Sequence, residues 1–221
     1  FQRNTATDLQ KGLERVSPST GVIIDLRGNA GGLLDEAVAV VDLFAARGLI
    51  VETRGPNQMS LESHQARAVT PFDHLSTVIL TDGESASASE IVAGAMRSLA
   101  GSQLVGTATY GKWSVQRMYV FEDESAIKLT VARYHIADPQ AGTDLVGLQP
   151  DVQVRRNTVD QQTIDRLLAI TRGNMEAESL LNQLAEKAVD EVAPPHLGPL
   201  SERITLDPQL AAAWTLAQNN R

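Results

Sequence analysis

Short, mostly apolar runs alternate with segments of helical spacing along the first half of the chain. A run of this kind is typical of a strand that is buried on both faces of a sheet. Such runs lie at residues 21–26, 49–53, 76–81 and 103–107. Apolar residues that recur at every third or fourth position predict helices over residues 5–16, 34–45 and 88–99. The alternation of strands and helices predicts an α/β core.

Two strand–helix–strand units follow from this pattern, over residues 21–53 and 76–107. Each is expected to form a parallel strand pair with a right-handed crossover. Farther along the chain the apolar period changes to two. Residues 115–120 and 127–132 therefore predict an antiparallel hairpin around a turn at residues 122–125.

The other segments give weaker signals. Residues 55–73 are polar and without a period, and we expect them to be irregular. Helical spacing returns over residues 159–192, and prolines at 194, 195 and 199 interrupt it. A last helix is predicted over residues 207–218.

The composition of the chain excludes several classes of protein. With 43% apolar and 21% charged residues it is neither a disordered chain nor a membrane protein, and no apolar run is long enough to span a bilayer. The net charge of −8 and the dispersed basic residues argue against a nucleic-acid surface. The lack of cysteine excludes thiol catalysis and Cys-ligated zinc. The four histidines show no ligand spacing, so we expect neither a metal nor a cofactor.

A serine cluster lies at the start of the helix predicted over residues 88–99, with Ser85, Ser87 and Ser89 at alternate positions. A hydroxyl at a helix start lies near free backbone N–H groups, which would stabilise an oxyanion. The simpler interpretation is that these serines cap the helix. Lys112 favours catalysis, because it follows the next strand and can meet Ser87 at the carboxyl edge of a parallel sheet.

A lysine acts as a general base only where burial disfavours its charged form. Its neighbours Tyr110, Trp113 and Val115 are able to provide such a setting, although a lysine on a loop is usually solvated. One rival interpretation is a phosphate loop, because residues 106–112 have the spacing G-x-x-x-x-G-K. We reject it, because Trp113 stands where the Mg²⁺-binding hydroxyl should be and a strand follows in place of a helix.

Two further alternatives rest on the spacing of residues in the sequence. Ser125 and Lys128 have the Ser-x-x-Lys spacing of penicillin-recognising enzymes, but in a strand an offset of three sends them to opposite faces. We therefore interpret Lys128 as structural. A Ser-His-Asp triad through His135 with Asp138 or Asp25 stays open as a less favoured alternative.

Residues 27–32 form a loop with three glycines between the first strand and its helix. The simpler interpretation is a tight strand-to-helix turn. The functional interpretation is that Gly31 or Gly32 exposes a backbone N–H beside that of Ala88, so that the two form an oxyanion hole.

These segments resemble the carboxy-terminal processing (tail-specific) serine proteases, peptidase family S41. The resemblance covers about residues 1–156, with the matching segments in family order. They are D-L-R-G-N-A-G-G-L at 25–33, S-A-S-A-S-E-I-V-A-G-A at 85–95, Y-G-K-W-S-V-Q at 110–116, K-L-T-V-A-R-Y at 128–134 and L-Q-P-D-V at 148–152.

The resemblance implies a role for each residue at a matching position. The catalytic residues would be Ser87 as nucleophile, Lys112 as general base and Gln116 as the residue that orients the lysine. The donors of the oxyanion hole would be the backbone N–H groups of Ala88 and of Gly31 or Gly32.

Three other positions matter for this assignment. Glu90 falls on the family's acidic position, one helical turn beyond Ser87, as a candidate supporting residue. Trp113 replaces the usual small glycine and could crowd or dry the surroundings of the lysine, and Ala30 replaces a common proline.

The fold implied by the resemblance is a crotonase-like or ClpP-like α/β core of repeated ββα units with a mixed sheet, plus a helical C-terminal region. The implied divisions are a protease core at 1–156, a helical insert at 157–205 and a C-terminal helix at 206–221 that returns to the core. Homo-oligomerisation through the C-terminal helices is a further expectation. No segment resembles the PDZ domain that the family usually carries upstream, and the first residue is Phe1, so we expect a protease core from a longer or processed protein.

The function implied by the resemblance is a Ser/Lys endopeptidase that cleaves protein or peptide substrates near their C-termini, without metal or cofactor. The implied location is extracytoplasmic, in the periplasm or cell envelope. An alternative is a catalytically silent peptide-binding module that has kept the fold. The intact serine, lysine and glutamine favour the enzyme, whereas likeness of fold alone would not.

Overall fold

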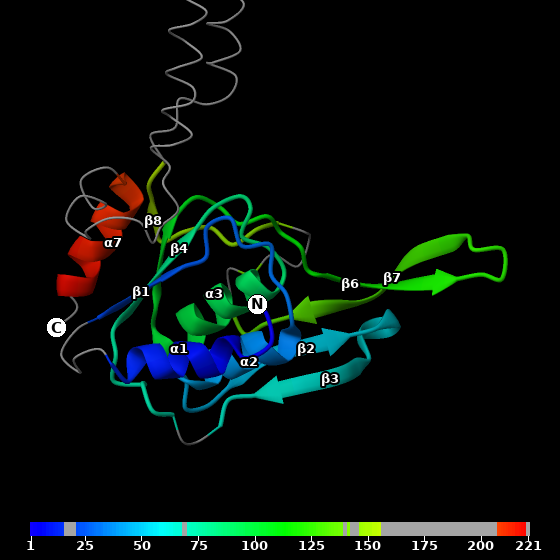
Figure 1. Cartoon of the computed structure of the whole chain (residues 1–221), viewed down its shortest axis with the longest axis horizontal. Helices are drawn as coiled ribbons and strands as arrows, with labels where there is room; N and C mark the ends of the chain where they lie inside the picture. Colours follow the sequence, from blue (N-terminus) through cyan, green and yellow to red (C-terminus); the bar gives the residue numbers. More distant parts are fainter. Residues whose placement is uncertain (16–20, 68–69, 139–140, 142–145, 156–206, 220–221) are drawn as a thin grey trace, which may run out of the picture. The chain divides into compact units, whose positions relative to one another are not determined.

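The computed structural model describes residues 1–15, 21–67, 70–138, 141, 146–155 and 207–219 of the 221-residue chain (Figure 1). Its helices are α1 (Thr5–Leu13), α2 (Leu34–Asp42), α3 (Ala88–Ala100) and α7 (Pro208–Asn219), with a short 3₁₀ turn η1 (Pro56–Gln58). Each α-helix within these described ranges confirms a predicted one. The second is shorter than predicted because the backbone N–H groups of Leu43 and Phe44 donate to the carbonyls three residues back, which tightens and ends the helix.

The first sheet is entirely parallel, in the order β1-β4-β5-β8. Its strands are β1 (Val22–Asp25), β4 (Thr77–Thr81), β5 (Gln103–Gly106) and β8 (Val152–Gln153). Every residue of β4 is buried, as expected for a strand covered on both faces. Because α3 connects the paired strands β4 and β5, the predicted strand–helix–strand unit at 76–107 is confirmed.

The second sheet is antiparallel, in the order β3-β2-β7-β6. Its strands are β2 (Leu49–Arg54), β3 (Ser60–Gln65), β6 (Ser114–Val120) and β7 (Ala126–His135). The predicted hairpin is confirmed as β6 and β7, which extend beyond the rest of the sheet (Figure 1). Residues 114–132 are called the β6–β7 arm below.

The prediction of a parallel strand pair over residues 21–53 is wrong. β1 pairs with β4, whereas β2 pairs antiparallel with β3 and β7. The reason is that β3 lies only a short turn beyond β2 and forms a local hairpin with it. β3 lies within the segment predicted to be irregular. Its residues are mainly polar and exposed, so the sequence shows no apolar face for it.

Helix α3 is the central element of the core. It contacts β2 of the antiparallel sheet, β4 and β5 of the parallel sheet, and helix α2. Every residue from Ala88 to Met96 is buried, and apart from Glu90 these residues are apolar or small. The serine cluster thus lies at the start of a helix that packs against both sheets.

The chain divides into two compact units. The first comprises Phe1–Val154 together with Ala212–Arg221, and the second comprises Arg155–Ala211. Within the first unit, the backbone and Cβ of Ala217 lie against Gly21, directly before β1. The predicted helical insert at 157–205 lies outside the described residues, so the predicted domain division remains a prediction. In the described part of the chain no helix is long and apolar enough to cross a membrane.

Candidate active site

Ser87 occupies the N-cap position of α3 in an unusual backbone conformation, with φ 57° and ψ −116°. These angles suit glycine at the first central position of a type II′ turn, and a residue with a Cβ rarely adopts them. Such a conformation persists only where the surrounding structure fixes it, and it is common at functional sites. The side chain of Ser87 is half-buried, whereas those of its two serine neighbours are fully buried.

Ser85 and Ser89 connect the glycine loop, residues 27–32, to the start of α3. The Ser85 hydroxyl donates to the carbonyl of Leu26 at 2.8 Å, and the Ser89 hydroxyl donates to the carbonyl of Asn29 at 2.8 Å. Both serines are fully buried. They therefore serve to hold two backbone segments together, and Ser87 is the member of the cluster that remains for chemistry.

Gly31 packs directly against residues 85–88, which are called the serine turn below. Its φ is +102°, and a Cβ built on it would lie 2.7 Å from the carbonyl oxygen of Ala86, 2.9 Å from the nitrogen of Ala88 and 3.0 Å from the Cβ of Ser87. Only glycine fits this position, because both the angle and the space exclude a side chain. The glycine loop and the serine turn, 56 residues apart in sequence from Gly31 to Ser87, thus form one surface.

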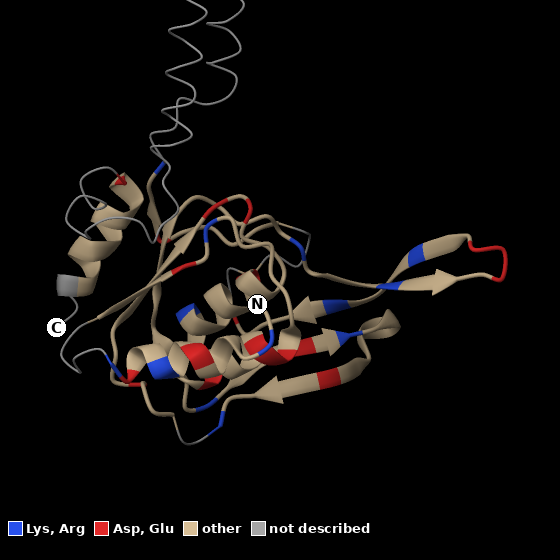
Figure 2. Ribbon diagram, in the orientation of Figure 1, with Lys and Arg blue, Asp and Glu red and all other residues tan. Residues whose placement is uncertain are grey.

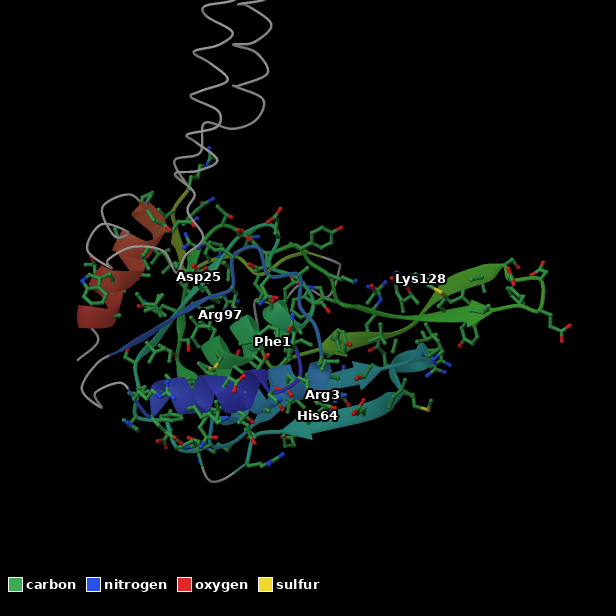
Figure 3. The ribbon with its side chains drawn as sticks, viewed as in Figure 1. Phe1, Arg3, Asp25, His64, Arg97 and Lys128 are labelled. Atoms are coloured by element: carbon green, nitrogen blue, oxygen red, sulfur yellow. The ribbon has the colours of Figure 1, made fainter. Side chains whose placement is uncertain are left out.

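The candidate oxyanion donors differ in availability. The N–H of Gly31 donates to Oδ1 of Asn29 at 2.9 Å, so it is already engaged. Among the described residues, neither the N–H of Ala88 nor that of Gly32 has an acceptor. Gly31 also accepts, through its carbonyl, a hydrogen bond of 2.6 Å from the amino group of Phe1, which Figure 3 shows near the centre of the first unit.

Glu90 forms several hydrogen bonds beside the serine. Its carboxylate is fully buried and accepts from four donors. Oε1 accepts from the Thr109 hydroxyl at 2.6 Å and from the Gly111 N–H at 2.7 Å. Oε2 accepts from the Ser87 N–H at 2.9 Å and from the Lys112 N–H at 2.7 Å.

The backbone of Lys112 therefore lies beside the serine turn, since its nitrogen and that of Ser87 contact the same oxygen. Its side chain is exposed, and no residue that the structure describes pairs with its amine. The neighbours of Lys112 do not form a dry setting around its side chain, which is solvated as is usual for a lysine on a loop. Tyr110 is 66% exposed, and Trp113 turns away into the hydrophobic core, where its indole N–H donates to the carbonyl of Val146 at 3.1 Å.

Gln116 lies on β6, four residues beyond Lys112, and its side chain is exposed. It is paired with Thr130 of β7, directly after a register shift at Val115. No hydrogen bond joins Gln116 to the serine or to the lysine among the described residues, so its predicted role remains a prediction.

The rival interpretations find no support in the structure. A strand, β6, follows Lys112, whereas a phosphate loop opens a helix. Lys128 lies exposed on the β6–β7 arm, away from α3 (Figure 3), in line with its structural interpretation. Within the described ranges no group of three His, Asp or Glu side chains is placed to hold a metal ion.

The carboxylates of the alternative histidine triad are engaged elsewhere. Asp25 accepts from Arg27 at 2.6 Å, and Asp138 accepts from Arg97 at 2.7 Å. In the strand register, His135 of β7 lies opposite Glu52 of β2. Each carboxylate thus already has a cationic partner, which disfavours a role for either in orienting His135.

Two residues that hold the site were not singled out from the sequence. Asp82 accepts from the Gly28 N–H at 3.0 Å, and Thr109 donates to Glu90. Asp82 lies between the matching segments and Thr109 precedes one of them, and neither residue type at these positions is distinctive. Nothing in the periodicity of the chain would have found them.

Comparison with known proteins places this arrangement in a family. Residues 1–154 match the family model described as Peptidase family S41. The chain is 36% identical over 164 residues to the carboxy-terminal-processing protease of Bartonella bacilliformis, covering 71% of this chain and 37% of that protein. It is 33% identical over 158 residues to the carboxy-terminal processing protease CtpA of Bacillus subtilis, covering 69% of this chain and 33% of that protein.

A solved structure shows the same fold. The photosystem II D1 C-terminal processing protease matches with a TM-score of 0.63 and 30% identity, covering 76% of this chain and 44% of that one. The chain spans about a third of the length of the two curated relatives named above. The matched segment contains the glycine loop, the serine turn and residues 110–113, which are called the lysine turn below. The chain belongs to peptidase family S41.

Proposed function

We propose that the chain is the catalytic core of a serine endopeptidase that cleaves protein substrates near their C-termini. The observation that carries the proposal is the strained Ser87 at the start of a buried helix, with the Lys112 backbone held to the same carboxylate oxygen. Three neighbouring elements thus converge at one point: the glycine loop, the serine turn and the lysine turn. The matched relatives are named as processing proteases, which supports the same activity here.

The chemistry would be acyl transfer through Ser87. The serine oxygen attacks the peptide carbonyl carbon, while its proton passes to the neutral amine of Lys112. The carbon–nitrogen bond then breaks, and the lysine returns the proton to the leaving amine. Water, deprotonated by the same lysine, hydrolyses the acyl ester and restores the serine.

The backbone N–H groups of Ala88 and Gly32 are the favoured oxyanion donors, since neither has an acceptor among the described residues. The N–H of Gly31 is less favoured, because it already donates to Asn29. Ala88 also lies at the first turn of α3, where the helix end adds a positive potential.

The lysine completes the site through its side chain. An amine acts as a base in its neutral form, which removal from water favours. Because the Lys112 side chain is exposed while its backbone is fixed, a substrate that covers the site would both dehydrate the amine and place it near Ser87. Gln116 is proposed to orient the amine once it turns inward.

An extended substrate would bind by strand addition. β6 is the edge strand of the antiparallel sheet and begins two residues after Lys112. A peptide that pairs with this edge through its main chain would pass close to the lysine turn. We also propose an extracytoplasmic location, in the periplasm or cell envelope, on the basis of membership of this family.

A catalytically silent peptide-binding module is the second candidate. It is favoured by the exposed Lys112 side chain, for which the described residues offer no partner. Cleavage of an unfolded protein substrate by the wild-type chain, Ser87→Ala and Lys112→Ala distinguishes the two. If the chain is a protease, both substitutions should abolish cleavage but leave substrate binding intact. Equal cleavage by all three proteins would contradict the Ser/Lys assignment, and binding without cleavage by the wild type would favour the silent module.

A further inference from the structure

Glu90 is a buried carboxylate whose four partners all donate hydrogen bonds. Burying a carboxylate is unfavourable unless donors replace its water shell. Three of the donors here are backbone N–H groups, and no cationic side chain pairs with Glu90 among the described residues. The carboxylate is thus held by the local backbone, and in turn it holds that backbone.

The fourth donor also requires a carboxylate at this position. The Thr109 oxygen accepts from the N–H of Leu148 at 2.7 Å, so its own proton is directed to Glu90. A glutamine in place of Glu90 would have one oxygen and one NH₂ group. Wherever the NH₂ group pointed, it would face a backbone N–H, because each carboxylate oxygen receives at least one.

The two oxygens of Glu90 have different partners. Oε1 joins Thr109 and Gly111 within the turn after β5. Oε2 joins two separate segments, since it accepts from Ser87 at the start of α3 and from Lys112 before β6. The nitrogens of the two proposed catalytic residues therefore cannot lie farther apart than the sum of these two short distances.

The Ser87 backbone has a conformation that needs such support. A residue with a Cβ rarely adopts φ 57° with ψ −116°, and it stays there only if neighbouring contacts fix it. The hydrogen bond from the Ser87 N–H to Glu90 is one of these contacts. Loss of that contact leaves the serine free to relax toward an ordinary conformation.

We propose that Glu90 is a positioning residue that locks the strained Ser87 backbone and the Lys112 backbone to one carboxylate oxygen. This inference rests on the proposed function, because that function gives Ser87 and Lys112 their catalytic roles. Glu90 touches no substrate in this account. It presets the distance over which the exposed lysine side chain must reach, so that only the side chain has to move.

The first test measures backbone strain and needs no catalysis. Ser87→Gly and Ser87→Ala are compared in the full chain, with Glu90 and with Glu90→Gln. With Glu90 present, the glycine variant should have a Tm that is about 2–6 °C above that of the alanine variant, because glycine tolerates the conformation without strain. With Gln at position 90 this difference should fall by at least half. An unchanged difference would overturn the proposal.

The second test measures positioning. The rate constant for labelling of Ser87 by a fluorophosphonate is compared at a temperature where circular dichroism shows every variant folded. Glu90→Gln should label about tenfold or more slowly than the wild type. The matched control is Ser102→Ala, which removes a buried hydroxyl bonded to Thr77 at the start of β4 and touches neither oxygen of Glu90. It should label within about twofold of the wild type, and an equal loss in both variants would show a general structural role and overturn the proposal.

A third measurement needs no substitution and applies if Glu90→Gln does not fold. Hydrogen exchange in the wild-type chain should show the Ser87 and Lys112 amides exchanging with the same protection factor, because one opening event releases both. Exchange of the Lys112 amide a hundredfold faster than that of Ser87 would contradict a shared lock. If the strain and exchange results hold while no serine labels, the proposed function fails and the positioning role of Glu90 in the backbone stands.

Discussion

The serine side and the lysine side of the candidate site are built in different ways. The serine turn is enclosed by buried side chains, with Ser85, Ser89 and Glu90 fully buried and each bonded to a neighbouring backbone segment. On the lysine side, Lys112 itself is fixed through its backbone alone, and the side chains of Lys112 and Gln116 are exposed. The backbone of the proposed nucleophile is thus fixed by the fold, whereas the proposed base is placed only up to its Cα.

The contrast continues into the β6–β7 arm. Beyond the point where β2 ends, the arm has no further strand partner among the described residues. Its turn is acidic (Figure 2), and several of its apolar side chains are at least 41% exposed, namely Met118, Tyr119, Val120, Phe121, Ile127 and Leu129. Substitutions on the serine side should therefore change stability far more than those on the arm.

The largest effect is expected for Gly31→Ala. The added Cβ would meet the backbone of Ala86 and Ala88, and φ of +102° is unfavourable for alanine. The free energy of unfolding should fall by about 2–4 kcal/mol, as measured by urea denaturation. The control is Gly83→Ala, where the added Cβ has open space, and its change should stay within about 0.5 kcal/mol. Equal effects at both glycines would break the comparison.

Ser85→Ala should have the next largest effect. The substitution removes the buried hydroxyl that donates to the carbonyl of Leu26 and accepts from the N–H of Asp82, so two hydrogen bonds are lost. A loss of about 1–3 kcal/mol in the free energy of unfolding is expected. The proposed cleavage of protein substrates, measured below the transition temperature, should persist, because Ser85 is assigned to structure. Complete loss of cleavage in a folded Ser85→Ala chain would argue against that assignment.

Trp113→Phe tests the lysine side, and a moderate loss of stability is expected. It removes the indole N–H that donates to Val146 while keeping an aromatic ring in the core. Stability should fall by about 1 kcal/mol in thermal unfolding. A much larger loss would mean that the lysine turn is fixed by its side chains as firmly as the serine turn.

The smallest effect is expected on the arm. Met118→Gln changes a side chain that is 62% exposed and is paired with Lys128 across the hairpin. The free energy of unfolding should change by no more than about 0.5 kcal/mol. A clear destabilisation would show that the exposed face of the arm packs against something in the native protein.

The sequence predicted the elements better than their pairing. The helix starting at Ala88 and the strands around it follow from uninterrupted apolar spacing, so α3, β4 and β5 were found. Pairing of β2 was missed because β3, S-L-E-S-H-Q, is a polar edge strand whose sequence carries no apolar period. An edge strand is stabilised by backbone hydrogen bonds to its neighbour, which a period of apolar residues does not reveal.

For the site, sequence likeness selected the residues and the structure supplied their relations. The role of Glu90 follows from a buried carboxylate facing backbone donors from two segments, which no spacing encodes. The exposure of Lys112 could not be predicted either. It depends on Trp113 turning into the core and Tyr110 toward solvent, and both choices are set by packing.

The most direct test of the central claim maps where a serine-directed reagent reacts. The full chain is treated with a fluorophosphonate, and the modified residue is identified by mass spectrometry in the wild type, Lys112→Ala and Lys128→Ala. The account predicts labelling at Ser87 in the wild type and in Lys128→Ala, and its loss in Lys112→Ala. Labelling at another serine, or equal labelling of Ser87 without Lys112, would contradict the assignment of nucleophile and base.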